Sequence, residues 1–285
     1  MRIDLHAHST ASDGTDTPAE LMRAARKSGL DVVAVTDHDT TDGWREAVEH
    51  RPPGLTVVLG AEFSCVHRTQ DGRRISLHVL GFLFDPDHPA LKSELRRLRE
   101  SRDGRARAIV DNLRQAGVPV SWDSVAAFAD GGAVGRPHIA RALVAEGVVP
   151  DLPAAFRDVL SSRQPYYVPK ADTPVLDALA LIRAAGGVAA FAHPRATRRG
   201  PVVGDDVVAA MAAAGLAALE VDHPDHDEND RAHAARLARD LDLVPLGSSD
   251  YHGTNKVTPL GECTTDPAAY ERLIDRATAG RPVHG

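Results

Sequence analysis

Short apolar runs alternate with amphipathic stretches along most of this chain, and this alternation constrains its fold more than any other feature. The apolar runs, where we expect strands, lie at 2–5, 31–36, 56–59, 77–84, 187–192, 216–221 and 243–247. The amphipathic stretches, where we expect helices, lie at 18–28, 43–50, 174–185, 203–214, 228–241 and 267–279. Such alternation is typical of a parallel sheet with helices outside it, and short strands with long helices favour a closed barrel over an open sheet. We therefore predict an α/β fold with an irregular barrel of about seven strands.

The first helix and the strand after it have clear local signals. Thr17, Pro18 and Glu20 supply an N-cap, a first-turn proline and a capping box, and Gly29 follows the helix. Residues 31–36 then form a continuous apolar run, which suits a strand that is buried on both faces of a sheet.

The segment 86–165 breaks the alternation. It holds four helix-like stretches, at 89–115, 122–129, 137–146 and 152–160, and no convincing strand. We expect a barrel made of residues 1–85 and 166–285 with a helical insertion at 86–165, which returns to the barrel mouth and caps the site. A separate helical domain is the alternative, but no low-complexity spacer flanks the segment.

Composition limits the partners of the chain. Its 285 residues carry a formal net charge of -7 and only 4% aromatic residues, which argues against a surface that binds long nucleic acids. Its two cysteines form no disulfide framework. No basic segment leads into an apolar one at the N-terminus, and nowhere do about 18 uncharged apolar residues run together, so we expect a cytoplasmic location without a membrane partner.

Nearly every apolar run ends in a histidine or a carboxylate. In the first, His6 and His8 stand two residues apart and point to the same side of a strand end, which suits one metal ion. The full set is His6, His8, Asp13, His38, Glu62, His78, His193, Asp250 and His252. A single strand-end histidine is more often structural than a ligand. The joint pattern predicts a metal site, because barrel enzymes keep their chemistry at the C-terminal ends of their strands.

With these elements the chain resembles the polymerase and histidinol phosphatase (PHP) family of metal-dependent phosphoesterases. The matching motifs span the chain in the family's order: 4–9 with 12–14, 36–39, 60–62, 78–81, 192–194 and 249–252. The resemblance implies a distorted seven-stranded β/α barrel with three divalent ions. The first ion would lie on His6, His8, Glu62 and Asp250; the second on Glu62, His78 and His193; and the third on Asp13, His38 and His252.

Charge counting is consistent with a phosphate substrate. Three divalent ions against three carboxylates leave roughly +3, and a bridging hydroxide lowers this to about +2, which matches a phosphate monoester dianion. Mixed imidazole and carboxylate ligands suit Mn, Fe or Zn better than Ca or Mg, and we expect Mn. The expected mechanism is in-line attack on phosphorus by a metal-bridging hydroxide, with His193 or Asp250 as a proton relay.

Several residues outside the ligand set are expected to contact substrate. In the family branch with a helical insertion, which resembles nucleotide phosphatases and short-RNA 5′-to-3′ exonucleases, Arg-Pro-His and Pro-Lys elements contact phosphate. This implies such roles for Arg136, His138 and Lys170. Arg136 is equally well explained as a solvated helix-end residue. Arg195 follows a ligand motif and would reach the mouth.

Two further histidine and arginine groups have open interpretations. His223 and His226 lie at a strand end and are either pocket residues or ordinary loop histidines. The six arginines between 96 and 107 are interspersed with acidic residues, which favours the solvated face of a long helix over a track that guides an oligonucleotide.

The expected function is removal of the 3′-phosphate from nucleoside 3′,5′-bisphosphates, with short 5′-phosphorylated RNA as a related substrate. A nucleoside monophosphatase, a histidinol phosphatase and a metal-stabilised interaction module are the alternatives. A cap with two cationic contacts suits a second phosphate better than an imidazole and an amine. The complete ligand set argues against a non-catalytic module.

Overall fold

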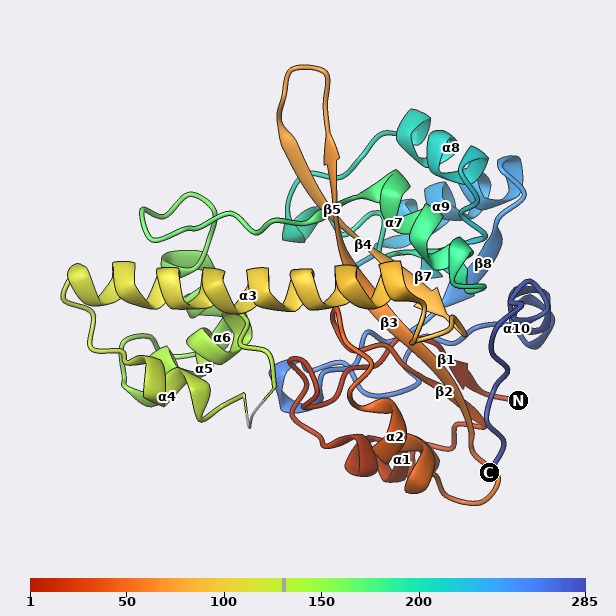
Figure 1. Cartoon of the computed structure of the whole chain (residues 1–285), viewed down its shortest axis with the longest axis horizontal. Coiled ribbons are helices and arrows are strands. Elements are labelled where there is room, and N and C mark those ends of the chain that lie inside the picture. The colour runs from red at the N-terminus through yellow and green to blue at the C-terminus, as the bar shows by residue number, and fades with distance from the viewer. Residues whose placement is uncertain (130–131) are drawn as a thin grey trace.

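The computed structural model describes residues 1–129 and 132–285 and forms an α/β barrel (Figure 1). Its main sheet runs in the order β1 (Ile3–Asp4), β2 (Val32–Val35), β3 (Thr56–Arg68), β4 (Arg74–Phe82), β6 (Val188–Ala192), β7 (Ala218–Asp222) and β8 (Val244–Gly247). The short β5 (Thr173–Pro174) pairs with β3 outside this order. A bridge between Ala7 and Tyr251 brings the two edges together, so the sheet nearly closes. The predicted irregular barrel of about seven strands is confirmed.

The helices that accompany these strands are α1 (Pro18–Lys27), α2 (Trp44–Glu49), α7 (Val175–Ala184), α8 (Asp205–Ala213), α9 (Glu228–Asp240) and α10 (Pro267–Ile274). The predicted start of α1 is confirmed, because Thr17 Oγ1 accepts a bond from Glu20 N (3.2 Å) and Glu20 Oε2 accepts one from Thr17 N (2.9 Å). No helix in the described ranges combines the length and apolarity that a membrane crossing requires.

Both faces of the sheet are buried. Along β2, Val33 and Val35 belong to one apolar cluster, and Val32 and Ala34 belong to a second cluster that also contains Leu273 of α10. The prediction that this strand is buried on both faces is therefore confirmed, because each successive side chain enters one of the two apolar clusters.

An all-parallel sheet was expected, and this expectation is wrong at one strand. β3 and β4 form an antiparallel hairpin, and β4 is also antiparallel to β6. The outer part of this hairpin projects beyond the rest of the barrel, as the orange loop of Figure 1 shows. His78 therefore lies within β4 rather than near the C-terminal end of a parallel strand. It still reaches the same end of the barrel, because its register pairs it with Ala192, next to His193.

The described residues of the segment 86–165 form helices with their connections and no strand, as predicted. They contain α3 (Pro89–Gln115), α4 (Trp122–Ala126), α5 (Arg136–Ala145) and α6 (Leu152–Ala154), followed by a π-helical turn at Ala155–Val159. In Figure 1 the long helix α3 extends from the barrel to the other helices of this segment. These helices share an apolar cluster of their own, which includes Ile109, Ile139 and Leu160. Residues 130 and 131 lie outside the described part of the segment.

Candidate metal centre and substrate cavity

The nine side chains expected to bind metal converge at one end of the barrel. All are buried except His78, which is half-buried. Among the described residues, three groups of donor atoms lie close enough together to hold an ion: His8, Asp13, His38 and His252; His6, His8 and Asp250; and His38, Glu62 and His78. Segments more than 240 residues apart in the chain thus meet in one place.

The first expected ligand set has the spacing of a metal shell. His6 Nε2 lies 3.1 Å from His8 Nε2, 3.4 Å from Glu62 Oε2 and 3.4 Å from Asp250 Oδ1. His8 Nε2 lies 3.3 Å from that Glu62 oxygen and 3.5 Å from that Asp250 oxygen. Ligands placed tetrahedrally at 2.0–2.1 Å from one ion are about 3.4 Å apart. The side chains therefore fit a divalent ion without rearrangement.

Glu62 lies at the centre of the cluster. Its Oε1 is 2.8 Å from His78 Nδ1 and 2.9 Å from His193 Nε2, while its Oε2 is 3.0 Å from His38 Nδ1. Burial alone would raise the pKa of this carboxyl, but the surrounding histidines, His78 and His38 foremost, hold it well below its usual range. Glu62 is therefore an ionised carboxylate with one oxygen toward each of two histidine groups, which is the arrangement of a bridging ligand.

Asp13 organises the third group. Its Oδ1 lies 3.4 Å from His252 Nε2 and 3.7 Å from His8 Nδ1, and its Oδ2 lies 3.7 Å from His38 Nε2. His8 thus faces the first group through one ring nitrogen and the third group through the other.

Three of the six clustered histidines are in the protonation state that suits metal binding. Burial lowers the pKa of His38 and His193 to about 3 and that of His252 to about 4, so these rings are neutral at pH 7. The buried His38 Nδ1 lies 3.0 Å from Glu62 Oε2, but in the described structure no contact of this nitrogen has the geometry of a hydrogen bond. A neutral imidazole with a free nitrogen is the form that binds transition metals.

Glu220 is a functional residue that the sequence analysis missed. It is fully buried, and its Oε1 lies 2.9 Å from His6 Nδ1 while its Oε2 accepts a 2.5 Å bond from the His193 backbone N–H. A carboxylate on the outer nitrogen of a histidine fixes the tautomer that offers the other nitrogen to a metal. The signal was a lone acidic residue within the apolar run 216–221.

Backbone strain also gathers at this site. Asp39, His193 and Asp250 have positive φ angles of 57°, 31° and 52°, which non-glycine residues rarely adopt. Asp39 is held there by bonds from Ser64 N and Ser64 Oγ, each 2.7 Å long. These three residues follow the C-terminal ends of β2, β6 and β8, where the positive φ angles fix the direction in which the chain leaves each strand.

A cavity of about 1210 Å³ extends from this cluster to the helical segment 86–165. It is lined by Asp13, His38, Glu62, His78, His193, Asp250 and His252 at one end and by Arg105, Arg136 and Phe156 from the helical segment. Its basic lining residues are Arg74, Arg102, Arg105, Arg136, Arg157, Arg163, Lys170, Arg198, Arg199 and Lys256. In a chain of net charge -7, this concentration of cations gives the cavity a strong local preference for anions.

The structure brings only some of the expected substrate residues to this cavity. Arg136 and Lys170 line it, whereas Arg195, His138, His223 and His226 are not among its lining residues. His138 Nδ1 accepts a 2.9 Å bond from Gly135 N at the start of α5.

The other three residues lie against neighbouring elements and loops. Arg195 Nε lies 3.5 Å from Asp230 Oδ1. His226 donates to Val221 O and accepts from Arg195 N, so both of its ring nitrogens are occupied. His223 Nε2 is buried 3.5 Å from Asp250 Oδ2.

The solvated-face interpretation of the arginines at 96–107 is wrong for two of them. Arg102 is largely buried and donates a 2.8 Å bond to Asp39 Oδ2, and both Arg102 and Arg105 line the cavity. Both fall on the helix face that carries Leu95, Leu98 and Ile109, because they follow the same three- and four-residue spacing. The sequence signal for these two buried arginines was their position on the helix face where the spacing predicts core residues.

Two more cations were missed next to Asp250. Arg199 Nη2 donates a 2.6 Å bond to Asp250 Oδ2, and Lys256 Nζ donates a 2.5 Å bond to the same oxygen. Asp250 thus turns Oδ1 toward His6 and His8 and Oδ2 toward these cations. Both cations come from loops without regular spacing, so the sequence offered no signal for them.

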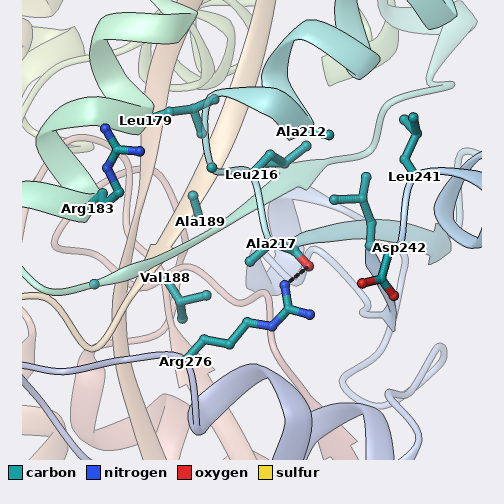
Figure 2. A pocket seen from close by; sticks show the side chains of 13 residues that line it. Leu179, Arg183, Val188, Ala189, Ala212, Leu216, Ala217, Leu241, Asp242 and Arg276 are labelled. Carbon is teal, nitrogen blue, oxygen red and sulfur yellow. Dashed lines mark hydrogen bonds between the residues drawn. The ribbon is translucent and has the colours of Figure 1, made fainter.

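A smaller cavity, of about 370 Å³, lies at the opposite ends of β6, β7 and β8 (Figure 2). Apolar side chains such as Leu179 and Leu216 line it together with Arg183 and Arg276. The dashed line in Figure 2 is a 3.4 Å bond from Arg276 Nη1 to Ala217 O. None of the nine clustered side chains lines this cavity, so we assign the chemistry to the larger one.

Comparisons with known proteins agree with this geometry. Residues 4–117 match the PHP domain model. The chain is 36% identical over 253 residues to a 5′-3′ exoribonuclease of Haemophilus influenzae, a match that covers 88% of this chain and 90% of the relative. It is 34% identical over 252 residues to the 3′,5′-nucleoside bisphosphate phosphatase of Chromobacterium violaceum, and this match covers 88% of this chain and 87% of the relative.

A solved structure supports the same assignment. It is that of a candidate metal-dependent phosphoesterase from Bifidobacterium adolescentis, with a TM-score of 0.90, 36% sequence identity and coverage of 97% of this chain and 96% of that one. The clustered histidines and carboxylates, the barrel and these full-length similarities lead to one conclusion: the chain belongs to the PHP family and is a metal-dependent hydrolase of phosphoric esters.

Proposed function

We propose that this enzyme removes the 3′-phosphate of nucleoside 3′,5′-bisphosphates. One observation carries the proposal: a single cavity joins the ligand cluster to Arg136 and Lys170. A substrate with two phosphates would place the reacting one at the cluster and the other at these cations. The bisphosphatase activity of the Chromobacterium violaceum relative supports this choice.

The proposal includes three bound divalent ions. Mn is the preferred metal, and Fe or Zn are the alternatives. His6, His8, Glu62 and Asp250 would hold the first, Glu62, His78 and His193 the second, and Asp13, His38 and His252 the third. The spacing of the first set and the two-sided contacts of Glu62 and His8 support this division. Bound ions would supply Lewis-acid activation of phosphorus and of water, and would stabilise the departing alkoxide.

The chain's own residues then orient the reaction. Glu220 fixes the ring of His6, and Arg199 and Lys256 set the direction of the Asp250 carboxylate. His193 and Asp250 are the proposed proton-relay groups, since both line the cavity and lie in the cluster. Arg136 and Lys170 bind the second phosphate.

The proposal divides the chain into a barrel of residues 1–85 and 166–285, which carries all nine expected ligands, and a helical insertion at 86–165. The separate apolar cluster of the insertion supports this division. Both cysteines, Cys65 and Cys263, are buried free thiols, as suits the reducing cytoplasm in which we place the enzyme.

Short 5′-phosphorylated RNA is the second candidate substrate. The cavity, at about 1210 Å³, exceeds the range of about 300–1,000 Å³ that is usual for small-ligand pockets. Arg157 and Arg163 add cations on the insertion side. This room would accommodate a following nucleotide, and the Haemophilus influenzae relative is an exoribonuclease.

A substrate panel with added Mn tests the proposal. Phosphate release should be fastest from adenosine 3′,5′-bisphosphate, slower from AMP and negligible from histidinol phosphate, and a 5′-phosphorylated RNA trimer should yield mononucleotides if the second candidate also holds. Arg136→Met should raise KM for the bisphosphate and leave the KM for 3′-AMP unchanged. Preferred hydrolysis of histidinol phosphate would refute the proposal, and no turnover of any substrate would favour a metal-stabilised module.

A further inference from the structure

Three aspartates lie in the motifs that the chain shares with its family but are not among the nine expected ligands. Asp4 lies on β1, and Asp37 and Asp39 follow the end of β2. All three are buried. A buried carboxylate is stable only where several donors satisfy it, so the contacts of these residues indicate their role.

Each of the three aspartates binds one serine in the same way. One carboxylate oxygen accepts the backbone N–H of the serine, and the other oxygen accepts the hydroxyl of the same serine. The pairs are Asp4 with Ser249, Asp37 with Ser9, and Asp39 with Ser64. These bonds are between 2.5 and 3.0 Å long. We call this paired contact a clasp.

The three clasps connect segments that are neighbours in the barrel. The Asp4 clasp joins β1 to the segment after β8, the Asp37 clasp joins the segments after β1 and β2, and the Asp39 clasp joins the segment after β2 to β3. Every aspartate and serine of a clasp lies within two positions of an expected ligand. A clasp therefore fixes one ligand-bearing segment against the next.

The Asp4 clasp connects two members of the first expected ligand set. Asp4 lies two residues before His6, and Ser249 directly precedes Asp250. Asp4 Oδ2 also accepts a 2.8 Å bond from Gly261 N, which adds a third donor to this carboxylate. The separation of 3.4 Å between His6 Nε2 and Asp250 Oδ1 is thus supported by bonds behind both ligands.

The Asp37 clasp acts on the third expected ligand set. Asp37 directly precedes His38, and its Oδ1 accepts a further 2.6 Å bond from Ser12 Oγ. Ser12 in turn directly precedes Asp13. Asp37 therefore holds the turn at 9–14, which carries Asp13, against the segment that carries His38.

The turn at 9–14 is compact enough to transmit this contact. Ser12 N and Gly14 N both donate to Ser9 O, at 3.1 and 2.9 Å. A β-carbon on Gly14 would lie 2.4 Å from His8 O, so only glycine fits there. The position of Asp13 thus depends on bonds to Asp37 and on bonds within the turn.

We propose that Asp4 and Asp37 are positioning residues for separate metal sites, Asp4 for the first ligand set and Asp37 for the third. The inference rests on the proposed division of the nine ligands among three ions. A carboxylate offers two acceptor oxygens and no donor, whereas asparagine turns an amide N–H toward one of the two donors of the serine. Partners that orient metal ligands in this way contribute about 10- to 100-fold to metal affinity. Asp39 also holds Arg102, so its substitution would disturb two contacts, and the test uses the other two aspartates.

Anomalous scattering from Mn in crystals shows which site each variant loses. Crystals of Asp4→Asn and Asp37→Asn are equilibrated with Mn at the lowest concentration that fills every site of the unaltered enzyme. Asp4→Asn should lose signal at the first ligand set and keep it at the third, and Asp37→Asn should show the reverse. Each variant is the matched control of the other, because both carry the same change at a buried aspartate. Loss of the same site in both variants, or no loss in either, would overturn the proposal.

Serine variants provide a second test, which holds even if an aspartate variant does not fold. Ser249→Ala removes one hydroxyl bond to Asp4, and Ser12→Ala removes one to Asp37. Each should weaken one Mn site about 2- to 10-fold, as measured from free Mn by electron paramagnetic resonance, and crystals should show the weakened site at the first and the third ligand set respectively. Asp111→Asn, at an exposed position of α3, should keep the affinities of the unaltered enzyme. Parental affinity in both serine variants would overturn the proposal.

Crystals of the unaltered enzyme separate the clasps from the proposed division of the ligands. If its ions lie on other combinations of the nine side chains, the division is refuted. The positioning roles then still stand if each aspartate variant loses the ion nearest to its own clasp, and they fail if it does not.

Discussion

Glu220→Gln should weaken metal binding while leaving the fold intact. The Glu220 carboxylate accepts from three donors: His6 Nδ1–H and the Ser248 hydroxyl on Oε1, and the His193 backbone N–H on Oε2. Glutamine has the same size but only one acceptor oxygen. Its amide nitrogen must therefore face a donor on one side or the other, and the negative charge behind His6 is lost.

The expected loss of affinity follows from these contacts. Removal of a carboxylate behind a metal-binding histidine usually costs 10- to 100-fold in affinity. Glu220 supports two expected ligands, His6 and His193, so we expect a loss near 100-fold, about 2.7 kcal/mol. Mn affinity is measured by competition with a fluorescent chelator at pH 7.5, after dialysis against EDTA.

The control for this substitution is Glu228→Gln, which makes the same chemical change at an exposed position at the start of α9. It should leave Mn affinity within twofold of the parent. If Glu220→Gln were to retain parental affinity with an unchanged circular dichroism spectrum, then Glu220 would not orient the ligands, and the carboxylate–histidine–metal reasoning would be refuted.

Three further predictions concern stability, pH and metal removal. Asp39→Asn should lower the free energy of unfolding by about 3–5 kcal/mol in urea titrations, because it leaves the buried Arg102 without a counter-charge; a loss under about 1 kcal/mol would contradict a stabilising role for the Asp39–Arg102 ion pair. Neighbouring carboxylates outweigh burial and raise the pKa of His8 to about 9. Mn must displace this proton, so Mn affinity should rise with pH up to about 9 and fall by up to about tenfold per unit below it, and a flat profile between pH 6 and 8 would exclude this competition. Dialysis against EDTA should abolish phosphate release, and Mn should restore it within one assay, whereas activity that persists without metal would exclude the proposed chemistry.

The positions of the barrel strands could be predicted from sequence because each apolar run faces a core on both sides. The hairpin of β3 and β4 was missed for a local reason. The run at 77–84 resembles the other buried strands, and its direction is set by the turn before it, where Asp71 and Gly72 supply a common hairpin signal. The prediction that His78 lies at the same end of the barrel as the other expected ligands was still correct. Although β4 runs in the opposite direction, its register with β6 places His78 opposite Ala192, next to His193.

The ligand cluster was predictable because metal ligands are defined by chemical type and by their place at strand ends. The cations of the cavity were not, since arginine serves equally well on a solvated surface. Arg102 and Arg105 became distinct only when the packing of α3 showed which of its faces is covered. His138 Nδ1 and both ring nitrogens of His226 bond to nearby backbone groups, and neither residue lines the cavity, which the sequence pattern alone does not reveal.

All nine expected ligands are encoded outside residues 86–165, while the insertion side of the cavity comes from that one contiguous block. The cavity residues of this block can therefore change without any change in the segments that encode the nine clustered side chains. Exchange of this block between homologues at the matching boundaries, with the Asp39–Arg102 pair retained as the connector, offers a direct route to hybrid enzymes of altered preference.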